Sequence, residues 1–193
     1  NLSYFGNNNE AHCIYNFSLA PLLIHSIVKG SSFYLKKWSR SMPPAQENNS
    51  YLNFLSTHDG IGFRPLEGIL PTDEIQNYID FLKKQGALLS YRKDKKKESV
   101  YEVNITLLDA FKQTFLGNDS FNIERFLLAH SILLSLEGIP AIYIQNLLGS
   151  RNDNIKVNNT GHNRSINRRN WNYDDLKLKL KKQDEKNYLI YSS

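Results

Sequence analysis

Three short apolar runs, each leading toward a stretch with helical character, most constrain what this chain can fold into. The runs are strand-like and lie at residues 12–17 (HCIYNF), 51–57 and 141–145 (AIYIQ). Parallel strands need a long crossover, usually a helix, so strands that alternate with helices are typical of an α/β protein. The alternation therefore predicts the α/β class, built from repeated βα units.

The segments between these runs carry the signals of helices and one hairpin. Amphipathic runs, glycine stops and proline breaks predict helices at 19–28, around 35–38, from Thr72 as a cap to a stop at Gly86, at 107–115, at 123–136 and at 173–184. Strand-like residues 88–92 and 100–106 flank a charged tip at 93–98, which predicts a β-hairpin. Residues 149–170 read as one long polar loop.

The length of the chain limits how such units can be arranged. A complete barrel of eight βα units takes about 250 residues, and this chain has 193, part of which belongs to the helix and hairpin between the second and third strands. The pattern therefore predicts either a small open α/β domain or a piece of a barrel.

Composition and charge argue against several other classes of protein. No stretch approaches the roughly 20 apolar residues of a membrane span. The formal net charge of +5 comes mostly from lysine runs at 93–98 and 177–182, and acidic residues accompany both, so we expect solvated surface and no nucleic-acid binding. The single cysteine, Cys13, allows no internal disulfide, fits a reducing cytoplasm, and is expected to be a small buried hydrophobe.

The motif THDGIG at 57–62 places His58 and Asp59 directly after a predicted strand, followed by Gly60 and Gly62. In α/β folds, ligands lie at the carboxyl ends of strands, and glycines there allow tight turns and close approach. A His-Asp-Gly sequence is also ordinary turn chemistry. At this point both interpretations remain open.

The other polar residues offer no complete catalytic set. Acid–base chemistry at a glycosidic bond needs two carboxylates, and the remaining acids give Asp59 no evident partner. The five histidines show no metal-ligand spacing, so we predict no metal, and His25 and His130 are expected to be structural. Arginines at 164–169 could pair with sugar hydroxyls, a carboxylate or a phosphate, or could belong to a solvated loop.

Several longer motifs, taken together, resemble a known family. THDGIG (57–62), VYEVN (100–104), EGIPAIYI (137–144), LLGSRND (147–153) and RSINR (164–168) occur in the order found in the sucrose phosphorylase branch of the α-amylase superfamily, and IYNFSLAPLLIHSI (14–27) adds to the match. The resemblance runs from about residue 3 to about residue 180. It implies a partial (β/α)8 barrel, with residues 1–71 as the sixth and seventh βα units, 72–106 as an inserted helix and β-hairpin, and 107–193 as the last units.

The resemblance also implies a reaction and assigns residues to it. Such enzymes are retaining glucoside phosphorylases: an α-glucoside and inorganic phosphate give α-glucose 1-phosphate through a glucosyl-enzyme, with no cofactor. By match, Asp59 is the transition-state stabiliser and His58 and Arg168 hold the glucosyl ring. Tyr101 and Glu102 fall in the acceptor-side loop, where they are expected to contact acceptor or phosphate. The partners implied are small molecules only, with no prediction of oligomeric state.

The chain also departs from this family. The nucleophilic aspartate and the acid/base glutamate belong to segments before Asn1, so the chain by itself is expected to be inactive. The run Phe63–Gly68 is closer to glucosylglycerate phosphorylases than to strict sucrose phosphorylases, which would place Arg64 near an anionic acceptor. Two alternatives are a glycosidase or transglucosidase fragment of the same superfamily, and a noncatalytic carbohydrate-binding α/β piece.

Overall fold

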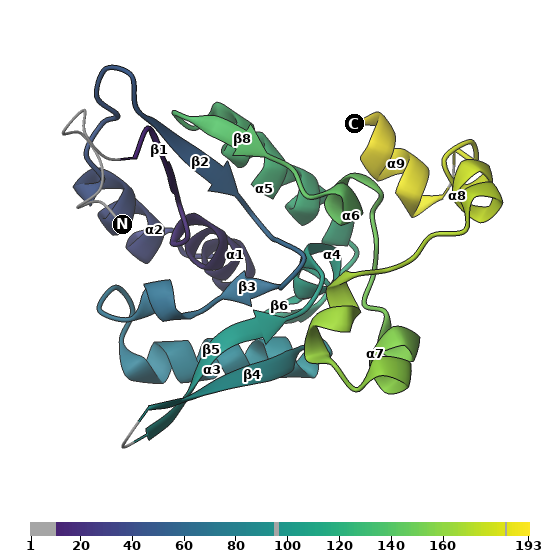
Figure 1. Ribbon diagram of the computed structural model, residues 1–193, viewed down its shortest axis with the longest axis horizontal. Helices are drawn as coiled ribbons and strands as arrows, with labels where there is room; N and C mark the ends of the chain where they lie inside the picture. Colours follow the sequence, from purple (N-terminus) through teal and green to yellow (C-terminus); the bar gives the residue numbers. More distant parts are fainter. Residues whose placement is uncertain (1–10, 95–96, 184) are drawn as a thin grey trace.

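The computed structural model describes residues 11–94, 97–183 and 185–193, and it shows a mixed α/β chain (Figure 1). Its central sheet has three parallel strands in the order β1 (Cys13–Tyr15), β2 (Ser50–Phe54) and β8 (Ile139–Ala141). The first two overlap the predicted strands at 12–17 and 51–57, the third begins just before the predicted one, and the three pair in sequence order, so the α/β class is confirmed. Within the described residues the sheet does not close into a barrel.

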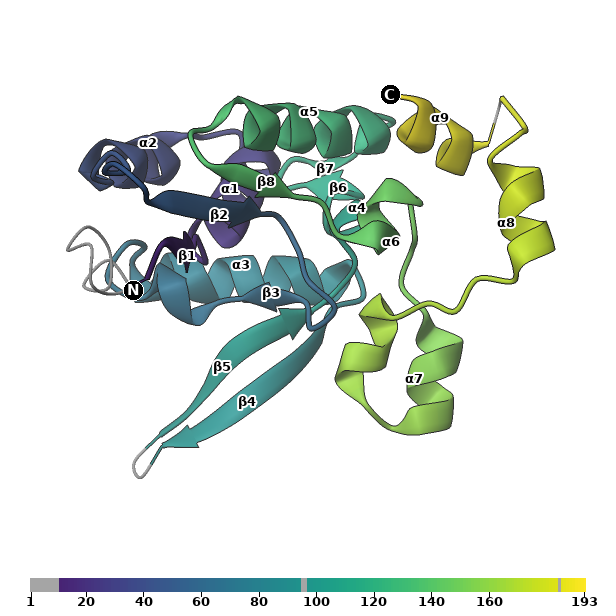
Figure 2. The same ribbon diagram turned by 45° about the horizontal axis from the view of Figure 1, so that its top comes forward.

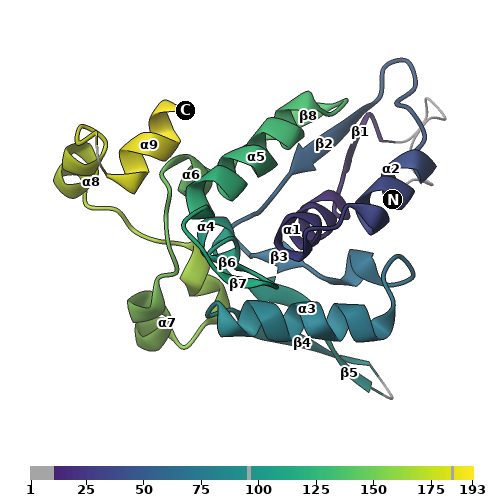
Figure 3. The ribbon, with the colours of Figure 1, turned by 180° about the vertical axis from the view of Figure 1, so that it is seen from behind.

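Helices cover one face of this sheet, as Figure 3 shows from behind. They are α1 (Leu19–Lys29), α2 (Phe33–Ser41) and α5 (Asn122–Ser135). Helix α1 ends at Gly30, whose φ of 71° is the left-handed conformation expected at a glycine stop. Leu22 and Ile24 of α1 are fully buried in one core with Leu133 of α5.

A second, antiparallel sheet lies beside the first, in the order β3 (Ile61–Gly62), β5 (Lys97–Asn104) and β4 (Leu88–Asp94). Strands β4 and β5 form the predicted hairpin, which projects from the body in Figure 2. Their register shifts by one residue in the middle of the hairpin. Ser90 pairs with Glu102, but Tyr91 pairs with Val100, so Tyr101 is an extra residue in a β-bulge.

Helix α3 (Thr72–Lys84) runs between these strands in the chain, close to its predicted limits. One detail of the prediction is wrong: the cap is Pro71 rather than Thr72, and no side chain caps the helix. Asp73 and Glu74 lie in the first turn, where the helix dipole favours negative charge.

Four predicted segments differ from the structure. The predicted strand at 141–145 is replaced by β8 at Ile139–Ala141 and the short helix α6 (Ile144–Leu147). Pairing with β2 begins earlier in the chain than expected, directly after Gly138. The backbone of Gly138 packs closely against β2, and a Cβ there would lie only 2.5 Å from the Tyr51 carbonyl oxygen.

The other three differences lie after β5. The predicted helix at 107–115 is limited to α4 (Leu107–Ala110) and is followed by a small hairpin of β6 (Gln113–Thr114) and β7 (Gly117–Asn118). The predicted loop at 149–170 contains α7 (Asn154–Thr160), and the predicted final helix is divided into α8 (Tyr173–Lys179) and α9 (Lys186–Ser192). Residue 184, the predicted end of that helix, lies outside the described residues. Single helical turns occur at η2 (Arg64–Leu66) and η3 (Asn163–Asn167).

The prediction that Cys13 is buried is also wrong. The thiol is free and Cys13 is exposed. In β1 the residues alternate between the two faces, so Ile14 is buried while Cys13 and Tyr15 face outward.

The described residues contain neither a membrane-spanning helix nor a cluster of metal-binding side chains. None of the helices there combines the length and apolarity needed to cross a bilayer. No group of three or more histidine, cysteine, aspartate or glutamate side chains is placed there to bind a metal ion.

Candidate functional site

Asp59 lies just beyond the carboxyl end of β2, in a turn held by its own neighbours. The Gly60 amide donates to the Thr57 carbonyl (3.3 Å), and the Asp59 amide donates to Thr57 Oγ1 (3.2 Å). Gly60 has a φ of 125°, and a Cβ there would lie 2.6 Å from the Val103 carbonyl oxygen. Only glycine fits this approach to β5, so the turn places Asp59 against the second sheet.

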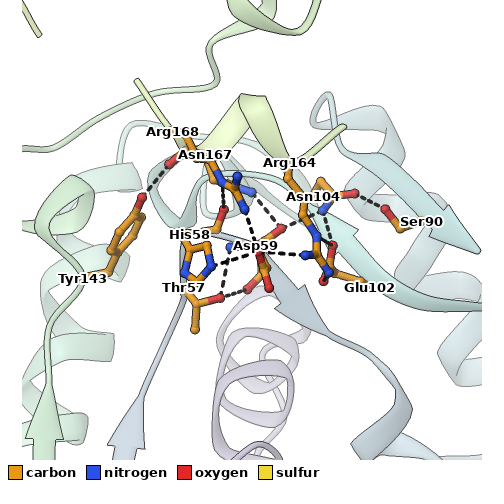
Figure 4. A network of polar contacts seen from close by, with 11 residues as sticks. Thr57, His58, Asp59, Ser90, Glu102, Asn104, Tyr143, Arg164, Asn167 and Arg168 are labelled. Atoms are coloured by element: carbon orange, nitrogen blue, oxygen red, sulfur yellow. Dashed lines mark hydrogen bonds and ion pairs between the residues drawn. The ribbon is translucent and has the colours of Figure 1, made fainter. Parts of the chain in front are cut away.

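One carboxylate oxygen of Asp59 is surrounded by nitrogen donors (Figure 4). Arg168 Nη2 lies 2.8 Å from Oδ1, Arg164 Nη1 lies 3.1 Å away, and His58 Nε2 lies 3.2 Å away. The Asp59 side chain remains 29% exposed and that of His58 63% exposed. Among the described residues Oδ2 accepts no hydrogen bond.

The backbone of Asp59 is fixed independently of its carboxylate. Its carbonyl oxygen accepts hydrogen bonds from Asn104 Nδ2 (2.6 Å) and Asn167 Nδ2 (3.3 Å). Asn167 is itself held, because the Tyr143 hydroxyl donates to its carbonyl (2.9 Å). Burial raises the pKa of Tyr143, so this phenol stays protonated and donates at neutral pH. The carboxylate therefore projects from a rigid main chain.

Glu102 is the second carboxylate of the cluster, and it is buried. Its side chain is 8% exposed and makes a two-point ion pair with Arg164: Nε donates to Oε1 (3.1 Å) and Nη2 to Oε2 (2.9 Å). This hydrogen bonding raises the pKa of Arg164, so its guanidinium is permanently charged. Arg164 thus joins the carboxylates of Asp59 and Glu102 through one planar group.

The charges of the cluster balance. Two carboxylates, Asp59 and Glu102, face two guanidinium groups, those of Arg164 and Arg168, and the His58 ring lies beside Asp59. A cavity of about 510 Å³ adjoins the two arginines and is lined by polar residues, namely Ser90, Gly161, His162, Asn163 and Ser165. A balanced set of fixed donors and acceptors suits an uncharged, hydroxyl-rich ligand better than a bare ion.

The structure brings some of the predicted site residues together and leaves others apart. Asp59, His58, Glu102 and Arg168 belong to one network, as described above. Arg64 is exposed and lines a separate cavity of about 580 Å³, between α3 and the hairpin. Tyr101 also lines that cavity, although its phenol still contributes to the raised pKa of Arg164.

Asn104 and Asn167 of the network were not among the predicted site residues, and Arg164 was considered only as one of the loop arginines that could pair with sugar hydroxyls, a carboxylate or a phosphate. Each lies in a motif that the sequence analysis singled out, VYEVN or RSINR. The signal available was the alternation in β5, which puts Asn104 on the same side as Glu102. By contrast, Arg151 of LLGSRND pairs with Asp109 outside this network.

A mixed α/β chain with a fixed carboxylate and two arginines at the carboxyl end of a parallel strand belongs to the general class of α/β proteins with a polar ligand site at that edge. Comparison with known proteins is more specific. The chain is homologous to glucosylglycerate and sucrose phosphorylases over nearly its whole length, and it spans about a third of theirs.

The individual matches agree with each other. Glucosylglycerate phosphorylase from Escherichia coli (strain K12) is 39% identical over 99% of this chain, which corresponds to 34% of that protein. Sucrose phosphorylase from Agrobacterium vitis is 30% identical over 86% of this chain and 34% of its own length. The crystal structure of sucrose 6F-phosphate phosphorylase from Thermoanaerobacter thermosaccharolyticum matches with a TM-score of 0.77 and 26% identity, over 93% of this chain and 35% of that one. No family model matches the chain.

Proposed function

We propose that this chain is part of a retaining glucoside phosphorylase. The complete enzyme would transfer a glucosyl group from an α-glucoside, of the sucrose or glucosylglycerate type, to inorganic phosphate and release α-glucose 1-phosphate. The observation that carries the proposal is the Asp59 carboxylate: it follows a strand end, two arginines contact one of its oxygens, and no described residue hydrogen-bonds to the other. The homology to glucoside phosphorylases supports this reading of the site.

In this proposal Asp59 stabilises positive charge on the sugar. In the first step the bond between glucose C1 and the leaving-group oxygen breaks as the enzyme's nucleophilic carboxylate bonds to C1. In the second step the bond to that carboxylate breaks as a phosphate oxygen bonds to C1. Both steps pass through an oxocarbenium-like transition state. A fixed carboxylate beside C1 stabilises that charge without changing its own protonation. His58, with an exposed ring, and Arg168 hold the sugar hydroxyls, while the nucleophile and the acid/base belong to other segments of the enzyme.

The acceptor side would be formed by β5 and the turn before α3. Tyr101 and Arg64 line one cavity there, which fits a role for both in contacting the acceptor or phosphate, with Arg64 facing an anionic acceptor such as glycerate. Both carboxylate oxygens of Glu102 accept hydrogen bonds from Arg164. Glu102 would therefore influence the acceptor through the Arg164 guanidinium rather than by direct contact.

The parallel sheet would be the sixth to eighth strands of a (β/α)8 barrel. In that arrangement residues 1–71 and 107–193 belong to the barrel, and 72–106 form an insertion. The order β1-β2-β8 and large exposed apolar side chains on or beside these strands support the assignment, among them Tyr15, Phe17, Ile139 and Ile142. The chain alone would be inactive, and we propose a cytoplasmic location for the complete enzyme.

The test is a phosphate-dependent release assay on the full-length polypeptide encoded by the gene. Sucrose, sucrose 6-phosphate and glucosylglycerate are compared, each with and without inorganic phosphate, and α-glucose 1-phosphate is measured. We expect it to form from at least one of the three only when phosphate is present. Release of free glucose at the same rate without phosphate would favour a glycosidase, and no turnover together with sugar binding would favour a noncatalytic module.

A further inference from the structure

Glu102 is placed at the site by an irregularity of its strand. The bulge at Tyr101 immediately precedes it, and bulges re-aim the side chains beside them. The resulting position is buried, and a buried carboxylate is unfavourable unless it is paired and hydrogen-bonded. The role of Glu102 therefore depends on the two side chains that bind its carboxylate, those of Arg164 and Asn104.

Those partners lead to Asp59 by two routes. The first is Arg164, which holds both oxygens of Glu102 and reaches Asp59 Oδ1 with its remaining nitrogen at 3.1 Å. A guanidinium is planar, so fixing two of its nitrogens on Glu102 also fixes the direction of the third.

The second route is the amide of Asn104, which is fully buried. Its Nδ2 donates to Glu102 Oε1 and to the Asp59 carbonyl oxygen, both at 2.6 Å. Its Oδ1 accepts from the Ser90 hydroxyl at 2.7 Å, which fixes the orientation of the amide. Glu102 is thus connected to the carboxylate of Asp59 through Arg164 and to its main chain through Asn104.

Arg168 shows that these routes are specific. Arg168 also contacts Asp59 Oδ1, at 2.8 Å, and its Nε donates to the His58 carbonyl. Within the described part of the chain, none of its nitrogens contacts Glu102. Loss of Glu102 would therefore leave Arg168 in place while Arg164 lost its orientation.

We infer that Glu102 is a positioning residue for Asp59, acting through Arg164 and Asn104, and that it sets where the Asp59 carboxylate stands relative to the sugar. This inference rests on the proposed function. A misplacement of about 1 Å in such a group lowers turnover by about a hundredfold, so the effect should fall on kcat more than on substrate binding.

The experiment uses the full-length polypeptide and the variant Glu102→Gln, which keeps the shape of the side chain and removes its charge. We expect kcat for phosphorolysis, measured well below the unfolding temperature, to fall about tenfold to a hundredfold, and KM for the glucoside to change less than about threefold. Tm should also fall, because the substitution leaves Arg164 without its buried charged partner. Glu124→Gln, the same change at an exposed glutamate of α5, should leave kcat and KM unaltered. A fall in Tm with kcat within about threefold of the wild type would mean a purely structural role and would overturn the inference.

A second set of variants tests the route through Arg164. Arg164→Lys keeps a positive charge beside Glu102 but loses the planar fork, so it should lower kcat in the same way as Glu102→Gln. In the double variant Glu102→Gln/Arg164→Lys the two losses should not add, because both remove one connection. Fully additive losses would overturn the inference.

Asp59→Asn separates the two proposals. If it abolishes phosphorolysis while Glu102→Gln remains as active as the wild type, only the positioning role is wrong. If Asp59→Asn is itself fully active, the proposed function fails and the inference fails with it.

Discussion

Asp109 and Asp59 each pair with arginine, and the comparison between them distinguishes a carboxylate that serves the fold from one that we propose serves a ligand. Asp109 of α4 is 11% exposed, and both of its oxygens are used: Oδ1 by Arg151 at 2.5 Å and Oδ2 by the Asn152 amide at 2.7 Å. Asp59 is more exposed and has all of its described partners on one oxygen. An internally saturated carboxylate holds chain segments together, whereas a half-saturated one at a strand end is free to meet a ligand.

The largest expected effect is the loss of activity in Asp59→Asn. The substitution removes the charge opposite the developing cation, so we expect kcat in the full-length polypeptide to fall by about 10²–10³-fold or more. Because the side chain is partly exposed, the free energy of unfolding should change by less than about 1 kcal/mol. Steady-state kinetics and denaturant unfolding measure the two quantities. Asp73→Asn, an exposed aspartate at the start of α3, is the control and should change neither.

Asp109→Asn should give the opposite result. It leaves Arg151, whose side chain is 37% exposed, without its charged partner and weakens the bond from the Asn152 amide, so we expect the free energy of unfolding to fall by about 2 kcal/mol. Turnover well below the unfolding temperature should stay within about threefold of the wild type. A large loss of kcat without loss of stability would contradict the distinction drawn between the two aspartates.

Gly60→Ala tests whether close approach of the backbone fixes Asp59. The new Cβ would meet the Val103 carbonyl oxygen at 2.6 Å, so the turn that carries Asp59 must move. Gly117→Ala is a matched control, because Gly117 has a similar φ of 113° but open space around it. We expect Gly60→Ala to lower the free energy of unfolding by about 2 kcal/mol more than Gly117→Ala does, measured by denaturant titration. Equal losses would mean that the backbone conformation matters and the approach to β5 does not.

The smallest expected effect concerns a third ionisable pair, His25 with Glu74, which joins α1 to α3 at 2.8 Å and lies outside the Asp59 network. Burial lowers the pKa of His25 below 6.5. Burial raises the pKa of Glu74, but hydrogen bonds from His25 and Lys29 outweigh it and bring the pKa below 4.5. For both groups the unfolded chain binds protons more readily than the folded one.

Stability should therefore fall as the pH drops below about 6.5, and fall further below about 4.5. Glu74→Gln should lower the free energy of unfolding by about 1 kcal/mol at neutral pH and weaken the loss at the acid end. The measurement is denaturant unfolding as a function of pH. A stability that is constant from pH 7 to pH 4 would show that the pair has no such role.

Much of the fold could be predicted from local signals, and so could half of the site. Gly30 ends α1 as expected, the predicted hairpin forms although its strands extend into the charged segment at 93–98, and His58 and Asp59 do follow β2. Helix α7 was not predicted, because residues 149–170 were interpreted as one loop. Its capping residues, Asp153 and Gly161, are nevertheless typical helix boundaries. Those cues were outweighed by the polar composition of the segment.

The amino-acid sequence by itself determined the elements and their class, because strand and helix periodicity, proline breaks and glycine turns act over a few residues. It also placed one carboxylate at a strand end. Only the tertiary structure decided what surrounds that residue: Arg164 and Arg168 reach its carboxylate and Asn104 reaches its backbone carbonyl, from segments far along the chain. Such pairing depends on how separate segments pack together, and no local pattern of residues specifies it.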